Sequence, residues 1–311
     1  TVQYTCSIGG YFGRFQGGAL ERLVDPTQLR RPCAAPASLE ALADAAHASD
    51  LEHYVALDAD QGAVHTQRHL APSTAQMSMQ ERATLAWLMM DREIQQNEAY
   101  RGAGSTASVL LLHSLDVPTA PWYASEYLAV TTVQLGDTRL VLCDAETGEA
   151  IPLTRLHHPD YPIESDRLSR QGAGVLTDSF GESRFLGTLA NTRSFGDTQA
   201  KRYGMTAEPE VRTHILQGSR FAFIAGFSDG IGDVMTDQEL VDECRYASHP
   251  QQAAERIMKY AEDLGAEDNA TILCIPLRGW GAIRGEDRTA LQRRDRRLNT
   301  DIYRNRRNLC L

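Results

Sequence analysis

The stretch Phe221–Phe227 constrains the fold of this chain more than any other segment. It is apolar almost throughout. A strand with one face in water alternates apolar and polar residues, whereas a continuous apolar run indicates a strand that is buried on both faces. The fold must therefore cover this segment on both sides, and the remaining elements have to supply that cover.

Two capping boxes mark where helices begin. In Ser78–Glu81 and Thr236–Glu239, the hydroxyl and the glutamate satisfy amides of the first helical turn. Helical spacing of apolar residues extends the first helix and predicts another between Pro250 and Gly265. The apolar stripes of these two helices consist of Ala83, Trp87, Met90 and Ile94, and of Ala253, Ile257, Tyr260 and Leu264. Shorter helices are predicted over 38–46 and 164–171.

The expected strands pair locally. The runs 127–135 and 138–144 flank the turn Gly136-Asp137, which predicts a hairpin. Further strands are predicted over 108–112, 150–153 and 271–277. Locally paired strands with helices in separate blocks favour an α+β fold, with antiparallel sheets and helices packed outside them. We divide the chain into an N-terminal segment with few signals (1–77), a core domain (78–277) and an Arg-rich tail (278–311).

Charge is distributed unevenly. The chain carries a net charge of −10, whereas the tail from Arg278 onward carries about +6, which leaves about −16 for the rest. An acidic body disfavours nucleic acid as a partner and suits sites that bind cations through carboxylates. Two interpretations of the tail stay open: it docks on an acidic partner, or it is a solvated, partly helical end.

Other features narrow the compartment. No apolar stretch approaches the ~20 residues that cross a bilayer. The six cysteines are scattered without a CxxC pair, so the pattern indicates neither a zinc site nor a disulfide framework, and it favours a reducing intracellular compartment. The first residue is Thr1 and no secretory signal follows it, so we expect a processed, trimmed or incomplete chain.

Three aspartates stand where expected strands end in turns: Asp137, Asp229 and Asp268. Gly136 and Gly230 beside two of them permit tight turns. Carboxylates that converge at a sheet edge can hold Mg²⁺ or Mn²⁺ in octahedral oxygen geometry. The alternative is that Asp-Gly and Asp-Asn are ordinary turn sequences.

The order of six motifs resembles that of the 2C-type (PPM) metal-dependent protein serine/threonine phosphatases. The less specific segments between the motifs are similar in general character to fungal members of the mitochondrial branch of this family. The motifs are Gly104–Ala107, Val133–Arg139, Leu153–Pro159 with Glu164, Arg167 and Gly172, Leu189–Asp197 with Lys201 and Ala207–Glu210, Phe227–Gly230, and Asp268–Thr271. They span roughly 104–277.

The resemblance implies a sandwich of two antiparallel sheets flanked by helices, with two or three Mg²⁺ or Mn²⁺ ions at one end. Asp229 and Asp268 match the ligands of one catalytic ion, and Asp137 matches the residue near a third, more labile one. Gly136, Gly230 and Asn269 lie beside these ligands in the motifs. The segment 172–187 matches the flap beside the active site.

The implied activity is hydrolysis of phosphoserine and phosphothreonine on a phosphoprotein substrate by metal-activated water, and the implied compartments include the mitochondrial matrix. His157 and His158 are interpreted as turn and packing residues.

The chain departs from the family at its front end. The family's phosphate-binding arginine, its acidic pair and its DGHGG loop are not found, and no catalytic residue is identified. Phe12–Gly18 carries Gln16 where the loop's aspartate would stand, and Asp58–Gly62 is too polar to end a buried strand. We therefore expect a sandwich that lacks its first strands, with residue 1 downstream of the lost segment and with impaired metal binding. The alternative is a catalytically inactive, phosphatase-like binding or regulatory protein.

Overall fold

The computed structural model describes residues 4–7, 77–100, 102–173, 175–177 and 183–309, and these form a β-sandwich. The first sheet has the order β1 (Tyr4–Ser7), β3 (Ala107–Ser114), β4 (Tyr127–Leu135) and β10 (Glu210–Gln217). The second has the order β12 (Ile272–Pro276), β11 (Phe221–Phe227), β5 (Arg139–Asp144) and β6 (Ala150–Pro152). Neighbouring strands run antiparallel in both sheets. There are also two small two-stranded sheets. In one, β2 (Gly104–Ser105) pairs with β9 (Phe195–Gly196), and in the other, β7 (Val175–Thr177) pairs with β8 (Ser183–Phe185).

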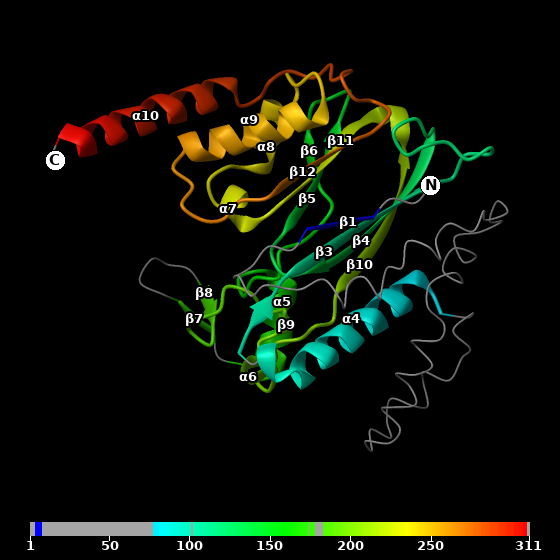
Figure 1. Ribbon diagram of the computed structural model, residues 1–311, viewed down its shortest axis with the longest axis vertical. Coiled ribbons are helices and arrows are strands. Elements are labelled where there is room, and N and C mark those ends of the chain that lie inside the picture. The colour runs from blue at the N-terminus through cyan, green and yellow to red at the C-terminus, as the bar shows by residue number, and fades with distance from the viewer. Residues whose placement is uncertain (1–3, 8–76, 101, 174, 178–182, 310–311) are drawn as a thin grey trace.

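Helices cover the outer faces of the two large sheets (Figure 1). Helix α4 (Met79–Gln96) lies along the first sheet, and α8 (Asp237–Cys244) and α9 (Pro250–Asp263) lie along the second. The shorter α5 (Pro162–Arg170), α6 (Thr198–Lys201) and α7 (Asp229–Gly232) lie at the end of the sandwich. Two 3-10 turns, Glu98–Tyr100 and Gly218–Arg220, and the C-terminal α10 (Ala290–Leu309) complete the described elements. The predicted α+β sandwich is confirmed. Within the described ranges no helix is long and apolar enough to cross a membrane.

Strand β11 is one of the two inner strands of the second sheet, and all of its residues are buried. Ile224 packs into the interior between the sheets, together with residues of β3, β4 and β5. Phe223 and Phe227 belong instead to the cluster that β11 forms with α8 and α9. The apolar run therefore predicted a strand buried on both faces correctly, because one layer is a sheet and the other is helical.

Both predicted capping boxes are present. The Ser78 hydroxyl accepts a hydrogen bond from the Glu81 N–H at 3.3 Å, and Thr236 accepts one from Glu239 at 3.2 Å. The stripes are confirmed as core-facing: Trp87 of α4 packs in a cluster with Phe195, and Tyr260 of α9 is fully buried. The predicted strands and the helix at 164–171 are found within about two residues. The predicted helix at 38–46 lies outside the described residues.

The predicted hairpin between 127–135 and 138–144 is wrong. Both strands form, but β4 pairs with β3 and β10, whereas β5 pairs with β11 and β6. The turn at Gly136 instead carries the chain from one sheet to the other. Gly136 adopts φ +106°, and a Cβ atom there would lie 2.2 Å from Thr106 Cγ2, so glycine is required. Hydrophobic alternation identifies a strand but not the sheet in which it pairs.

The Arg-rich tail is anchored to the body, which differs from the expectation of a solvated end. Arg293 is only 5% exposed, and it donates hydrogen bonds to Glu243 and Asp287. Arg296 binds both carboxylate oxygens of Glu239 at 2.7 and 2.8 Å. The reason lies in α8, which buries its carboxylates: charges removed from water need ionic partners. The predicted helical character is confirmed by α10.

A second buried carboxylate joins α5 to the segment that precedes β9. Glu164 is 2% exposed and accepts hydrogen bonds from Arg167, Arg193 and Thr192. Burial alone would raise the pKa of Glu164, but the hydrogen bonds and charges of Arg193, Thr192 and Arg167 lower it to about 2. Glu164 is therefore ionised in the folded chain and fixes α5 in place.

Replacing Arg293 tests whether α10 contributes to stability. We expect Arg293→Ala to lower the free energy of unfolding by about 3 kcal/mol, because buried carboxylates of α8 lose a partner. The control is Arg294→Ala in the same helix, whose side chain is exposed, and it should change stability by less than about 0.5 kcal/mol. Urea unfolding monitored by circular dichroism measures both. Equal effects of the two variants would contradict the anchoring role.

Replacing Glu164 tests the second network through its pH dependence. The folded pKa lies below the ordinary value of 4.5, so the ionised group stabilises the fold above pH 4.5 and loses this effect as the pH falls toward 2. We expect Glu164→Gln to cost about 3 kcal/mol at pH 7, and the difference from wild type to shrink as the pH falls below 4.5. Asp166→Asn, at an exposed position of α5, is the control and should show neither effect. A cost that does not change with pH would contradict the ionic role.

Candidate metal centre

The register of the second sheet brings the three predicted aspartates to one edge. Phe227, the last residue of β11, lies opposite Arg139 of β5 and opposite Ile272 of β12. Asp229 follows Phe227 by two residues, Asp137 precedes Arg139 by two, and Asp268 precedes Ile272 by four. Because the strands are antiparallel, all three aspartates extend beyond the same end of the sheet.

Backbone contacts fix the turn of Asp229 against the loop of Asp268. The Ser228 N–H donates to the Thr271 carbonyl at 3.1 Å, and the Thr271 N–H donates to the Ser228 hydroxyl at 3.0 Å. A Cβ atom on Gly230 would lie 2.4 Å from the Asn269 carbonyl oxygen, so glycine permits this approach. Gly230 and Asn269, which the motifs place beside the predicted ligands, are thus in direct contact.

The negative charges of this edge act on one another. Surrounding protein atoms displace part of the hydration shell of Asp229 and thereby raise its pKa, although its side chain still reaches solvent. The charge of Asp137 raises this pKa further, and those of Asp268 and Asp233 add smaller contributions. The Gly230 N–H, which donates to the Asp229 carboxylate at 2.9 Å, acts in the opposite direction. An edge where carboxylates oppose one another's ionisation attracts a cation.

Asp137 is held by its own turn and by Asn191. Its carboxylate accepts a hydrogen bond from the Asn191 amide at 2.9 Å. The preceding Gly136 N–H donates to His157 Nδ1 at 2.9 Å, and the His157 N–H donates to the Gly136 carbonyl at 3.0 Å. Burial, followed by the charge of Arg193, lowers the pKa of His157 to about 3, so its ring is neutral and Nδ1 remains an acceptor. His157 therefore positions the turn, which agrees with its interpretation as a turn and packing residue.

The carboxylate oxygens of this edge are suitable ligands for a hard divalent cation, but the described residues do not provide a complete set of ligands. Carboxylate oxygens are the ligands that Mg²⁺ and Mn²⁺ prefer. Among the residues that the structure describes, however, no three histidine, cysteine, aspartate or glutamate side chains are arranged to hold a metal ion. The motifs at the front end, which would supply further ligands, have their nearest counterparts (Phe12–Gly18 and Asp58–Gly62) outside the described residues.

Sequence reasoning missed two residues of this edge. Asp233 follows Asp229 by one helical turn of α7, and this i, i+4 spacing could have indicated that both lie on one face. Asn191 had no such signal, because it lies in a loop 54 residues from Asp137 and only the fold brings it there.

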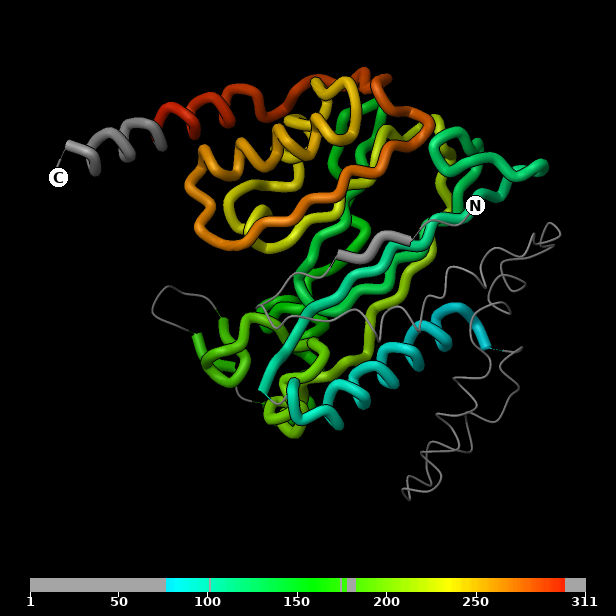
Figure 2. Tube along the Cα trace, in the orientation of Figure 1, coloured from blue at the N-terminus to red at the C-terminus, as the bar shows by residue number. Residues whose placement is uncertain are grey.

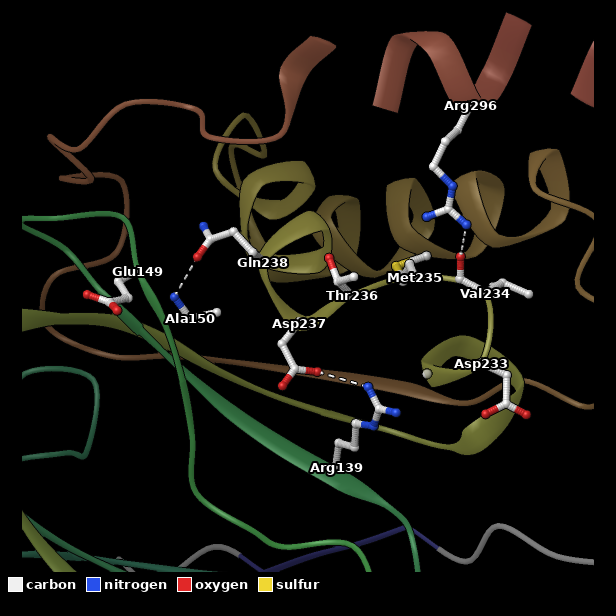
Figure 3. Close-up of a pocket in the computed structure, with 11 residues that line it drawn as sticks. Arg139, Glu149, Ala150, Asp233, Val234, Met235, Thr236, Asp237, Gln238 and Arg296 are labelled. Carbon is white, nitrogen blue, oxygen red and sulfur yellow. Dashed lines mark hydrogen bonds and ion pairs between the residues drawn. The ribbon is translucent and has the colours of Figure 1, made fainter. Parts of the chain in front are cut away.

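A polar pocket of about 600 Å³ opens next to this edge (Figure 3). It lies between β5, the segment after α7 and the start of α8. Arg139 and Asp237 face each other across it with a 3.2 Å ion pair, and Arg296 of α10 donates to the Val234 carbonyl. Asp233 also lines it, whereas Asp137, Asp229 and Asp268 do not. The pocket is therefore adjacent to the aspartate edge but distinct from it.

The predicted flap is partly described. Strands β7 and β8 form a small hairpin within 172–187, at the same end of the sandwich as α5 and α6 (Figure 1). Leu176 is 62% exposed there. The role of this segment as a flap beside an active site stays a prediction.

Comparison with known proteins places the chain in a family. The model of the family described as Protein phosphatase 2C matches residues 15–270. Over 161 residues the chain is 43% identical to Protein phosphatase 2C homolog 4 of Schizosaccharomyces pombe. This match covers 51% of this chain and 41% of that protein. Over 178 residues it is 32% identical to Protein phosphatase 1K, mitochondrial, of Xenopus laevis, with coverage of 57% and 44%. The chain thus spans less than half the length of these two relatives.

The fold agrees. The crystal structure of a serine-threonine phosphatase 2C from Toxoplasma gondii matches with a TM-score of 0.54 and 21% sequence identity, covering 89% of this chain and 85% of that one. A second phosphatase structure from the same organism matches with the same TM-score over 66% and 76% of the two chains. The family match, the relatives and the shared sandwich lead to one conclusion: this chain belongs to the protein phosphatase 2C family.

Proposed function

We propose that the protein to which this chain belongs hydrolyses phosphoserine and phosphothreonine on protein substrates with the help of Mg²⁺ or Mn²⁺. The observation that carries this proposal is the convergence of Asp137, Asp229 and Asp268 at one edge of the second sheet, in motifs that match the family's metal ligands. Asp229 and Asp268 are the proposed ligands of one ion, and Asp137 lies where a further ion would bind.

The chemistry of the edge supports a cation-dependent reaction. A bound divalent ion lowers the pKa of a water ligand and screens the charge of a phosphoryl group. The residues of the chain hold the carboxylates ready: β11 and α7 fix Asp229, and Asn191 together with the Gly136 turn fixes Asp137. The repulsion that raises the pKa of Asp229 is relieved when a cation neutralises its neighbours.

We also infer that this chain on its own is impaired. Its sequence contains no match to the family's acidic pair and DGHGG loop, and an open set of carboxylates binds Mg²⁺ or Mn²⁺ weakly because it replaces few of the ion's water ligands. The same observation favours a second candidate function, that of a phosphatase-like protein that binds or regulates other proteins without turnover. The two candidates differ in whether the protein made from its complete coding sequence releases phosphate.

For the compartment, we propose the mitochondrial matrix. The Xenopus relative carries the word mitochondrial in its name, and the spacing of the cysteines in this chain favours a reducing environment. Imaging the tagged full-length protein in cells tests this, and a signal that excludes mitochondria would contradict it.

Phosphatase activity tests the proposal directly. With a phosphothreonine peptide and Mn²⁺, we expect the full-length protein to release phosphate and this chain to release it at least about 100-fold more slowly. The loss of a residue that only supports a metal ligand already lowers metal affinity or activity by about 10- to 100-fold, and the loss of direct ligands should cost at least as much. Asp229→Asn in the full-length protein should abolish turnover, and chelation of the metal should do the same. The control is Glu255→Gln on the exposed face of α9.

The outcomes separate the two candidate functions. Unchanged turnover by Asp229→Asn would contradict the assignment of this ligand. A full-length protein that folds but releases no phosphate under any of these metals would establish the binding or regulatory function instead.

Metal binding can be tested without activity. We expect millimolar Mn²⁺ to raise the melting temperature of this chain by about 2–4 °C, because an ion that binds only the folded state stabilises it by mass action. Asp229→Asn should remove this shift, whereas Glu255→Gln should keep it. Without metal, Asp229→Asn should melt no lower than wild type, because it removes one of several mutually repelling charges. Equal shifts in all three chains would exclude this edge as the binding site.

A further inference from the structure

The side-chain oxygen of Asn191 is buried and has no hydrogen-bond partner among the described residues. Six buried polar side-chain atoms in the described part of the chain lack such a partner, and Asn191 Oδ1 is the only oxygen atom among them. A buried acceptor without a donor is unfavourable, and native proteins pair nearly all such groups. Asn191 Oδ1 therefore calls for a donor that the described residues do not supply.

Charge sets the orientation of the Asn191 side chain. Its amide nitrogen donates to an Asp137 carboxylate oxygen at 2.9 Å. The opposite orientation would set the amide oxygen, which can only accept, against a carboxylate that also only accepts when it is ionised. The oxygen and nitrogen of one amide lie about 2.3 Å apart. Asn191 Oδ1 is therefore no more than about 5 Å from that carboxylate oxygen.

His157 holds the backbone on both sides of this contact. The Thr192 N–H and hydroxyl donate to the His157 carbonyl at 2.8 and 2.9 Å, and the Gly136 N–H donates to His157 Nδ1 at 2.9 Å. Asn191 precedes Thr192, and Asp137 follows Gly136. The segment between β8 and β9, which carries Asn191, lies at the end of the sandwich where β4 ends (Figure 2). The fold thus places the amide beside Asp137 before any ligand binds.

The chemistry of an amide oxygen restricts what can pair with it. A phosphoryl group that is fully ionised presents only acceptors, so it cannot satisfy Asn191 Oδ1. Mg²⁺ and Mn²⁺ prefer oxygen ligands, and Mg²⁺ keeps several of its waters when it binds to protein carboxylates. Such a water donates hydrogen bonds to acceptors around the ion. Residues that contact a metal through its ligands orient those ligands and tune the affinity of the site.

We propose that Asn191 is a positioning residue of the candidate metal centre. Its amide N–H orients the Asp137 carboxylate, and its carbonyl oxygen accepts a hydrogen bond from a water ligand of a divalent cation bound at Asp137. This inference rests on the proposed function, because it takes the aspartate edge to be a cation site. It adds that the two polar atoms of one amide have separate tasks there.

Thermal unfolding of this chain over a range of Mn²⁺ concentrations tests the assignment without turnover. The rise of the melting temperature gives the dissociation constant, because the ion stabilises the folded state by mass action. Asn191→Leu removes both polar atoms at nearly constant volume and should raise this constant about 10- to 100-fold. The control Thr192→Val removes the hydroxyl that donates to His157 and Glu164. It should lower the melting temperature but change the dissociation constant less than about twofold.

Asn191→Asp separates the two halves of the amide, because it keeps an oxygen acceptor but loses the N–H donor. We expect it to bind Mn²⁺ at least as tightly as wild type. Without metal it should melt at a lower temperature, since a second carboxylate then lies against Asp137. Thr188→Asp adds the same charge at an exposed position of the same segment. Screening by salt should keep its effect on the dissociation constant below about twofold.

The outcomes distinguish this inference from the proposed function. If Mn²⁺ stabilises wild type through Asp229 and stabilises Asn191→Leu equally, the inference alone is overturned. Weaker binding by both Asn191→Leu and Asn191→Asp would also overturn it, because the amide would then act only through its N–H. If wild type shows no Asp229-dependent response to Mn²⁺, the proposed function is contradicted and this inference with it.

Discussion

The pairing of β11 with β5 on one side and β12 on the other is the interaction on which the rest of the structure depends. It buries an entirely apolar strand between the sandwich interior and the helices α8 and α9. It also sets the register that carries three aspartates beyond the same end of the sheet. A shift of one residue in either pairing would exchange the faces of the strand and misalign the carboxylates. Stability and the geometry of the candidate metal centre thus have the same cause.

Much of this could be predicted from the sequence, because the signals were local. The apolar run of β11, the capping boxes of α4 and α8 and the stripe of α9 depend on neighbouring residues alone. The aspartates could be named because they follow or precede strands at turns. The sheet assignment of β5 could not be predicted: the Gly136 turn looks the same whether it closes a hairpin or crosses between sheets. The role of Asn191 beside Asp137 and the anchoring of Arg293 also arise only when distant segments meet.

Buried carboxylates explain how α10 is attached to the domain, which hydrophobic patterns do not predict. Glu239, Asp242 and Glu243 lie on a short helix that its capping box predicts, but their burial requires cationic partners. Arg245, Arg256 and the arginines of α10 supply them. The sequence shows an acidic body and a basic tail, and the structure shows that part of this separation is neutralised within the molecule. Replacing such buried pairs by apolar residues is often tolerated, so their presence points to a function in orienting α10 and not only to stability.

That orientation links the tail to the segment next to the candidate metal centre. Arg296 binds Glu239, the residue that closes the capping box of α8, and it also donates to the carbonyl of Val234, which follows Asp229 by five residues. On the opposite side of the same segment, Arg139 of β5 forms an ion pair with Asp237, so the connection between α7 and α8 is held from two directions. Two arginines, one adjacent to the Asp137 turn and one in α10, therefore restrain the chain that leaves the aspartate edge. Leu291 and Leu298 of the same helix are exposed, so α10 is joined to this segment through its arginines and not through its apolar residues.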